Sequence, residues 1–453
     1  MSSRGIQPRA GRQSISLQAG TGKHGEGLKA LASIVTWALF TVSAFSDNRF
    51  PKPQFESGYV IPETSAAAAR ALQLEILDVA VLFLALSLAT WLILRKRSRR
   101  GVFVLTVFSL LYFGFWREGC ICSVGAVQNV VLWLFDSQYV LPVAAAAFFV
   151  LPLVFALFFG RVFCAAVCPL GVVQDLMVLV PVRVPRSLAR ALNLIPYVYL
   201  GLGALFAATG TAYVICRLDP FVPLFRFGGD LPIILAGVTL LLLGVFVARP
   251  YCRFLCPFGV LLNWAARLSK WRVTITPDEC VKCRLCERAC PFDAIQAPNV
   301  GQVSENRNVG VRRLVMLLFL VPLLVFVGGW AGSRLDVVLS RLNPSVKLVE
   351  TMRSNDQAKL KAMAFEVEAF GGGDITMESL VAEAKAVQKR FRTGGWILGA
   401  YLGAVIGMKL IGGSLSRTRE SYEPDKGECL GCARCYMSCP KERQRLKKLE
   451  GTA

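Results

Sequence analysis

Histidine is almost absent from this 453-residue chain, in which His24 is the only one. Haem b is ligated by two histidines on membrane helices, and haem c is attached at a Cys-x-x-Cys-His run that the chain also lacks. The Gly-rich dinucleotide-binding fingerprint and the Walker A loop are missing as well. The sequence therefore excludes haem bound in these ways and does not predict a nucleotide-binding enzyme.

Acidic residues are also few, with 30 Asp and Glu against 51 Lys and Arg. Within the apolar segments they are nearly limited to Glu75 and Asp78, whereas a proton or ion relay would need more of them. The basic excess is distributed over loops rather than gathered on one face of a domain. We therefore expect no nucleic-acid partner, and a pump or channel is disfavoured.

Long uncharged runs dominate the sequence, because 54% of the residues are hydrophobic and 18% are charged. A run of roughly 20 apolar residues can cross a bilayer as a helix, in which every backbone amide finds its partner. The sequence predicts an all-α polytopic membrane protein of about eight transmembrane helices. The predicted spans are 28–46, 75–94, 101–116, 138–160, 191–210, 231–248, 313–330 and 394–413.

Basic residues accumulate in cytoplasmic loops, which predicts the orientation of these spans. Loops 95–100, 161–190, 249–312 and 414–453 are basic, so they and both termini are assigned to the cytoplasm of a bacterial cell with the protein in its inner membrane. The alternate loops are assigned to the outside. The first span could instead be a cleaved signal peptide ending near residue 44.

Five regions follow from this pattern. Residues 1–27 have too little apolar content for a core and predict a disordered tail. The last two predicted spans form a hairpin, 313–413, whose external segment 331–393 is predicted to be a pair of helices around Gly371-Gly372-Gly373. The regions are the tail 1–27, a membrane domain 28–272, a first ferredoxin segment 273–312, a transmembrane hairpin 313–413 and a second ferredoxin segment 414–453.

Two cysteine runs carry the most specific chemistry. Each has the spacing Cys-x2-Cys-x2-Cys-x3-Cys-Pro, in which three thiolates bind one 4Fe-4S cube and the fourth binds the other cube of a bacterial two-cluster ferredoxin. A zinc site is the alternative for paired Cys-x2-Cys runs, but the third cysteine, the x3 spacing and the proline favour the cubes. One cube would take Cys280, Cys283, Cys286 and Cys439, and the other Cys429, Cys432, Cys435 and Cys290.

A second cysteine pattern is an internal repeat. FCAAVCPLGVVQD at 163–175 and YCRFLCPFGVLLN at 251–263 each follow a predicted span and an arginine, Arg161 or Arg249. The four cysteines at one depth would suffice for a further iron–sulfur cluster. The alternative is reduced structural thiols at helix ends. The cysteines are Cys164, Cys168, Cys252 and Cys256.

A degenerate third copy begins at Cys122, in CSVGAVQN, with Cys120 two residues earlier. Together with Cys216 these residues fall outside the membrane in the predicted topology. Three thiolates and one further ligand, such as Asp219 or a partner's residue, could hold a cluster there. A disulfide is the alternative in an oxidising compartment.

The combination of two Cys-x3-Cys-Pro motifs with two ferredoxin motifs resembles the membrane polyferredoxins of the NosR/NapH type, over roughly residues 101–440. The resemblance implies electron transfer between the quinone pool or a cytoplasmic donor and a periplasmic reductase. The segment 47–74 is too short for the periplasmic flavin-binding domain with which NosR-like proteins begin. NapH-like proteins have fewer spans, so neither substrate nor partner carries over.

These observations predict a membrane-bound electron-transfer protein with a split two-cluster ferredoxin domain on the cytoplasmic face, serving as a subunit of an oxidoreductase system. Clusters staged at different depths would cross a hydrocarbon core of about 30 Å in steps. The external partner would be a redox protein such as a flavoprotein or cytochrome, with quinone as a further candidate. The alternative is a non-catalytic redox sensor or an assembly factor for a respiratory complex.

Overall fold

A computed structural model describes residues 71–119, 122–275, 280–299, 307–354, 377–414 and 418–451. The chain divides into two units, Met1–Phe50 and Pro51–Ala453, and every described residue belongs to the second unit. The predicted tail 1–27, the predicted span 28–46 and Cys120 lie outside the described residues. The expectations for these segments therefore stay predictions.

Apolar helices make up most of the described chain. Seven of the eight predicted spans overlap them. Five are long and apolar enough to cross a membrane: Leu72–Arg95, Arg99–Trp116, Ser187–Ala208, Asn308–Ser333 and Met377–Ser414. Three are shorter: Ser123–Phe135, Val143–Phe159 and Leu231–Phe246. The helix at Ser123–Phe135 falls within the predicted outer loop 117–137, directly after Cys122 of the third repeat copy.

The first two described helices form a hairpin that buries a charge. α2 (Leu72–Thr90) continues as a π-helical turn η1 (Trp91–Arg95), and α3 (Arg99–Ser109) continues as η2 (Leu110–Trp116). The carboxylate of Asp78, fully buried in α2, lies 3.0 Å from Arg117 and accepts a hydrogen bond of 2.8 Å from the Tyr112 hydroxyl. This pairing explains how an acid is tolerated in an apolar helix.

The cysteine repeat appears as three similar units. α5 (Val143–Phe159) leads through α6 (Val162–Ala166) to α7 (Pro169–Met177), and α12 (Leu231–Phe246) leads through α13 (Pro250–Phe254) to α14 (Pro257–Arg267). The second cysteine of each motif caps the last helix, and proline takes its first position, where a missing N–H costs nothing. α4 (Ser123–Phe135) begins in the same way after Cys122.

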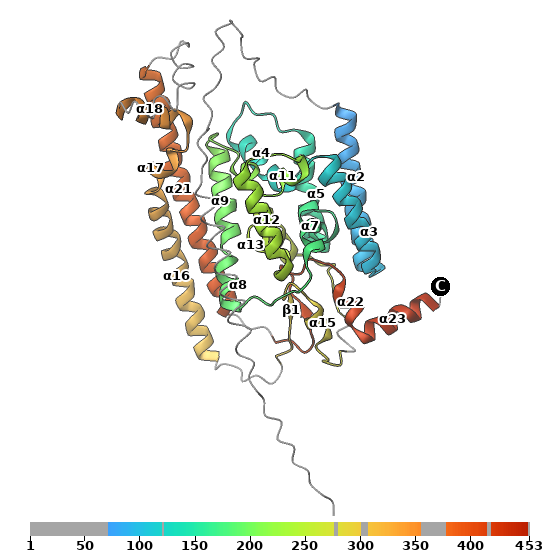
Figure 1. Ribbon diagram of the computed structural model, residues 1–453. Coiled ribbons are helices and arrows are strands. Elements are labelled where there is room, and N and C mark those ends of the chain that lie inside the picture. Colours follow the sequence, from blue (N-terminus) through green and yellow to red (C-terminus); the bar gives the residue numbers. More distant parts are fainter. Residues whose placement is uncertain are drawn as a thin grey trace, which may run out of the picture. The chain divides into compact units, whose positions relative to one another are not determined.

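The segment after α8 (Arg186–Leu192) brings two predicted site residues back to these units. α9 (Ile195–Ala208) packs against α4, α14 and α21. The short helices α10 (Val214–Arg217) and α11 (Val222–Arg226) then carry Cys216 and flank Asp219. α12 packs against α7, α11 and α13, which Figure 1 labels around it.

A hairpin of long helices separates the two ferredoxin segments. α16 (Arg307–Ser333) connects through α17 (Asp336–Ser340) and α18 (Pro344–Ser354) to α21 (Met377–Ser414), a single helix of 38 residues. The sequence predicted a separate external helix before the last span, but the described residues show the two as one continuous helix.

Glycine explains that continuity. A Cβ at Gly399 would collide with the carbonyl oxygen of Gly328, and one at Gly395 would collide with that of Gly332. Small residues spaced four apart let two membrane helices approach closely. Gly394 and Gly395 continue the helix between two neighbours, because Gly395 lies against Gly332 of α16 and Gly394 lies against Leu205 of α9.

The two ferredoxin segments, which precede and follow this hairpin in the sequence, contact each other. α15 (Leu285–Ala289) contacts α22 (Arg434–Ser438), which is followed by α23 (Pro440–Gly451). β1 (Ile295–Gln296) pairs antiparallel with β2 (Glu423–Pro424), with Ile295 opposite Pro424. Leu430, Ala433 and Tyr436 belong to the same hydrophobic core as the membrane units, so the second ferredoxin segment is packed onto them.

Candidate iron–sulfur centres

The two ferredoxin loops have the same unusual backbone. Lys282 and Arg284 lie between the first three cysteines of one motif, with φ of 54° and 61°. Gly431 and Ala433 occupy the matching places in the other motif, with φ of 68° and 60°. Non-glycine residues rarely adopt a left-handed conformation, and such residues cluster at binding sites. The repetition turns each loop tightly around a common centre.

The cysteines gather in the two sets that the sequence predicted. Cys286 lies within electrostatic range of Cys280, Cys283 and Cys439. Cys435 lies within range of Cys429, Cys432 and Cys290. Each motif therefore sends its fourth cysteine to the other set, and Cys435 is also in range of Cys286, so the two sets are neighbours. Which atoms bind iron stays a prediction.

The second set surrounds a cavity. Cys290, Cys429, Cys432 and Cys435 all line it, together with apolar residues such as Phe292 and Leu430. Burial raises the pKa of Cys286 to about 11 and that of Cys429 to about 12. The unmetallated thiols are therefore protonated at neutral pH, and a bound metal group would have to displace those protons.

Zinc requires a tighter arrangement than a cube does. A structural zinc ion holds its thiolates at about 2.3 Å from a single point. Within the described residues, no group of three or more His, Cys, Asp or Glu side chains converges in the manner of a single-ion site. The wider spacing around a shared cavity is compatible with a cluster of several irons.

Two arginines cross between the Cys-x3-Cys-Pro motifs. Arg249 is fully buried; its guanidinium lies against Gly171 of the first motif and donates to the carbonyl of Cys164. Arg161 lies in turn against Gly259 of the second motif, and its Nη2 is 3.8 Å from the sulfur of Cys164. At either glycine a Cβ would press on the arginine. Each motif thus supplies a cation to its copy.

The four thiols of this pair are mutual neighbours. Cys168 interacts electrostatically with Cys252, Cys164 and Cys256, and Cys252 interacts with Cys164. Gln174 joins the two motifs, because its Nε2 lies 3.3 Å from the sulfur of Cys252 and its Oε1 accepts from the Tyr251 amide at 2.9 Å. We call these four residues the membrane cysteines.

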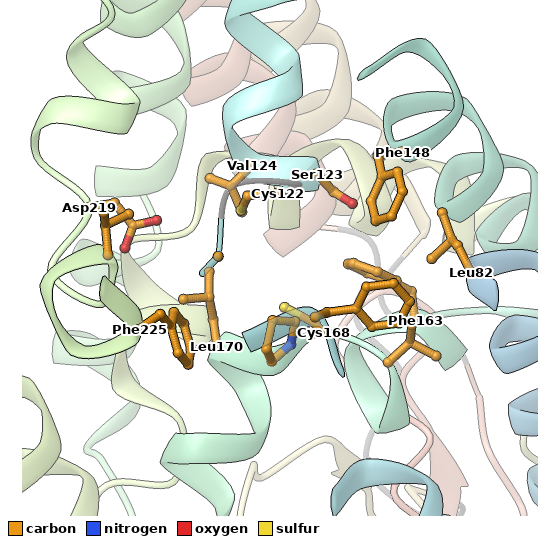
Figure 2. A pocket seen from close by; sticks show the side chains of 15 residues that line it. Leu82, Cys122, Ser123, Val124, Phe148, Phe163, Cys168, Leu170, Asp219 and Phe225 are labelled. Atoms are coloured by element: carbon orange, nitrogen blue, oxygen red, sulfur yellow. The ribbon is translucent and has the colours of Figure 1, made fainter. Parts of the chain in front are cut away.

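A cavity connects the membrane cysteines to the predicted outer site. Figure 2 shows Cys122 and Cys168 on opposite sides of it, with Asp219 at one end and Phe163 and Phe225 in its walls. Topology from the sequence assigned Cys122 to the outer side and Cys168 to the inner edge. The described residues bring the two to one cavity, because α5 packs against α4 and returns the chain from the end of α4 to the segment of Cys168.

Gln128 repeats the role of Gln174. Both lie six residues after a motif cysteine, and Gln128 Oε1 accepts from the Cys216 amide at 3.1 Å. A Cβ at Gly125 would lie 2.8 Å from the sulfur of Cys216, so the glycine admits that thiol. The Cys-x5-Gln spacing is shared by the copies at Cys122 and Cys168, whereas the copy at Cys256 has Leu262 at that position. It was the signal by which sequence reasoning could have found both glutamines.

Asp175 ties the membrane units to the second ferredoxin segment. Its carboxylate lies 3.1 Å from Arg99, 3.4 Å from Arg249 and 3.2 Å from Arg434, which stands between Cys432 and Cys435. Burial alone would raise the pKa of Asp175, but the three guanidinium groups outweigh it and hold the value at about 2. The carboxylate is therefore ionised throughout the physiological range.

Buried donors without a hydrogen-bond partner in the described structure stand beside the thiols. They include Arg161 Nε, Arg249 Nε and Gln128 Nε2. Unpaired buried donors are rare, and each calls for an acceptor. The sulfur atoms of an iron–sulfur cluster accept such hydrogen bonds, so the residues present fit this group.

Comparison with known proteins agrees with these motifs. Residues 141–186 and 230–276, which contain both Cys-x3-Cys-Pro motifs, match a family model described as a 4Fe-4S binding domain. Residues 273–296, which contain the first ferredoxin motif, match another model of the same description. The chain is a membrane protein with 4Fe-4S ferredoxin-type domains.

Among curated relatives, MJ0750 of Methanocaldococcus jannaschii is 29% identical over 44% of this chain and 82% of its own length. NirI of Paracoccus denitrificans is 30% identical over 47% of this chain and 33% of its own length. The regulatory protein NosR of Pseudomonas aeruginosa is 30% identical over 51% of this chain and 34% of its own length.

The chain is thus a homologue of NirI and NosR, and the resemblance predicted from its motifs is confirmed. It spans about a third of the length of each. No solved structure shows a significant match.

Proposed function

We propose that this protein conducts electrons from a cytoplasmic donor or the quinone pool, through its two ferredoxin cubes and the membrane cysteines, to a redox partner on the outer side. Iron–sulfur groups supply one-electron chemistry when bound. The chain's own residues bind them as thiolates, exclude water by apolar packing and offset negative charge with buried arginines. The proposal makes the chain an electron-transfer subunit rather than a catalytic one.

A series of neighbouring thiol groups, joined at one step by Arg249, carries this proposal. The first ferredoxin set adjoins the second through Cys286 and Cys435. Arg249 interacts electrostatically with Cys432 on one side and with Cys252 and Cys164 on the other. Cys168 then reaches Cys122, and Cys122 reaches Cys216. Such a series replaces one long electron jump by several short ones.

The proposed ligands are grouped as the sequence predicted. Cys280, Cys283, Cys286 and Cys439 would bind the first cube, and Cys429, Cys432, Cys435 and Cys290 the second. The membrane cysteines Cys164, Cys168, Cys252 and Cys256 would bind a third group. Cys120, Cys122 and Cys216 would bind a fourth, with Asp219, which is buried and interacts electrostatically with Cys122, or, in the alternative, include a disulfide.

Iron counting tests the number of groups. We expect anaerobically purified protein to contain more than eight irons per chain, and Cys164→Ala with Cys252→Ala to remove only the excess. Redox-titrated electron paramagnetic resonance should then retain the signals of the two cubes. Eight irons in the parent protein would limit the proposal to the ferredoxin pair.

Orientation is a further part of the proposal. Reporters fused after residues 98, 270 and 445 should report the cytoplasm of a bacterial cell, and one after residue 360 the outside. A cytoplasmic report at 360 would contradict the assigned sides and, with them, delivery of electrons to the outer surface.

A regulatory role is the second candidate, because the relative NosR is named a regulatory protein. A sensor or assembly factor needs its clusters to change state but does not need them to turn over. Isolated membranes should reduce and reoxidise the clusters with quinol or a low-potential donor at turnover rates if the protein conducts electrons. Slow, stoichiometric reduction would favour the regulatory role.

A further inference from the structure

The two ferredoxin sets differ in access from the surrounding solution. Cys283 of the first set is exposed, whereas the second set lines a cavity packed against the membrane units. Electrons entering from a soluble carrier would therefore reach the first set by the shorter path.

Cations surround the exposed cysteine. Lys282, Arg284 and Arg288 are all exposed, and none of them forms an ion pair within the described residues. Exposed apolar side chains adjoin them along the chain: Val281, which precedes Lys282, is 59% accessible, and Leu285, which follows Arg284, is 43% accessible. Met437, two residues before Cys439, is 49% accessible. We call these six residues the entry face.

α23 extends the positive charge of the entry face. The helix starts directly after Cys439, and Arg443, Arg445 and Lys447 on it are exposed. From Arg443 to Lys448 its exposed side chains are all polar, as suits a surface that attracts an acidic protein. Figure 1 shows α23 leaving the region where α15 and α22 meet.

We propose that the entry face docks an acidic, soluble one-electron carrier of the flavodoxin or ferredoxin kind. Small apolar patches ringed by one sign of charge are suited to brief encounters, because charge steers the partner and the apolar centre excludes water. One electron leaves the carrier, which is oxidised, and enters the first ferredoxin set, which is reduced. No bond forms or breaks, and no proton is transferred.

This inference rests on the proposed function and names the donor class for it. The probe is an acidic flavodoxin reduced to its hydroquinone, mixed with the full-length protein in detergent. The second-order rate constant is followed by stopped flow through the flavin semiquinone. Binding of oxidised flavodoxin is measured separately by titration calorimetry, which requires no electron transfer.

The test variant is Lys282→Glu with Arg284→Glu and Arg288→Glu. We expect it to lower the rate constant at low salt by about tenfold or more, since steering raises association rates by 10–10³, and to weaken binding. The parent rate should fall steeply with added salt. The control variant is Lys347→Glu with Arg353→Glu and Lys389→Glu, three exposed cations of α18 and α21, and it should match the parent.

A small viologen reductant separates this inference from the proposed function. It should reduce the clusters of all three proteins fully, and an intact cluster signal shows that the test variant has folded. Equal flavodoxin rates and binding in the test and control variants would overturn the entry face. A second variant, Arg443→Glu with Arg445→Glu and Lys447→Glu, tests α23. If this variant altered only binding to vesicles of anionic lipid, the inference would also be overturned, because α23 would then serve the membrane.

If the test variant fails to fold, Arg288→Glu alone supplies the comparison, and an unchanged rate in that protein would also overturn the proposal.

Discussion

The two paired cysteine regions are built on the same device and differ in their surroundings. In the ferredoxin pair, each motif sends its last cysteine to the set of the other motif. In the membrane pair, each motif sends the arginine that precedes it to the glycine of the other motif. Exchange between two copies makes each site depend on both halves.

Their environments assign them different tasks. The ferredoxin pair has an exposed cysteine, Cys283, whereas Cys164 and Cys168 of the membrane pair are buried beside the fully buried Arg249. An exposed site can exchange electrons with a soluble partner, while a buried one can only pass them within the chain. Under the proposed function, the ferredoxin pair would be the entrance for electrons and the membrane pair would be the relay.

Removing a ligand should have the largest effect on this comparison. We expect Cys432→Ala to remove the 4Fe-4S signal of the second cube and destabilise the first, because each motif serves both sets. Cys283→Ala should remove the first cube and affect the second less, because Cys283 is exposed. Iron content and low-temperature paramagnetic resonance of anaerobic protein measure both, with Ser438→Ala as the control. Unchanged signals in both cysteine variants would refute the ligand assignment.

The junction between the two regions should come next in size. Asp175→Asn leaves three arginines without their shared counter-charge, which typically costs about 3–5 kcal/mol for a buried pair. The denaturant midpoint of the detergent-solubilised protein should fall accordingly. Asp336→Asn, which changes a half-buried acid on α17 that forms no ion pair within the described residues, is the control.

The pH dependence of that difference follows from the pKa of Asp175. The folded value, about 2, lies below the ordinary 3.8, so the contribution is complete above pH 3.8 and disappears as pH falls toward 2. Parent and Asp175→Asn should therefore differ by a constant amount between pH 5 and 8. A difference that shrinks within that range would show that Asp175 is not held ionised by its arginines.

The hairpin offers a way to disturb one pair without the other. Gly399→Leu should push α21 from α16, at a cost of about 1–3 kcal/mol for overpacking, and weaken the ferredoxin pair, whose halves flank the hairpin. Gly412→Leu, at a site with nothing near its Cβ, should be silent. The ratio of ferredoxin to membrane-pair signals reports the outcome. Equal loss of both would show that the hairpin does not selectively support the ferredoxin pair.

Local patterns predicted much of this molecule. The ferredoxin motifs specify their own loops, since three cysteines at fixed spacing need only a few residues of backbone. Apolar runs located seven helices that the structure describes, because length and hydropathy are also local properties. The grouping of Cys286 with Cys439 followed from the known exchange of ligands in such motifs.

The depth of each cysteine along the helices and the packing of distant segments could not be predicted from those patterns. Counting basic loops assigns a side to each loop but measures no depth, so it separated Cys122 from Cys168, which line one cavity. The contact of Gly399 with Gly328 could not be predicted, because the two glycines lie in helices that are distant in sequence. Asp175 counted only as one loop acid, since its three arginines come from three other segments.

The crossing arginines should produce the smallest effect and the one most specific to the membrane pair. Arg161 is the better test than Arg249, because loss of Arg249 would also remove a partner of Asp175. Arg161 lies beside Cys164 and donates to the carbonyl of Gly427 at 3.2 Å. An electron added to a nearby cluster is stabilised by that cation, so Arg161→Gln should lower the reduction potential of the membrane group. A fall of about 60 mV corresponds to tenfold in a one-electron equilibrium. Arg161→Lys keeps the charge and should remain near the parent. Redox titration measures these potentials. Equal potentials in the Gln and Lys variants would show that Arg161 holds the two motifs together without affecting the reduction potential of the membrane group.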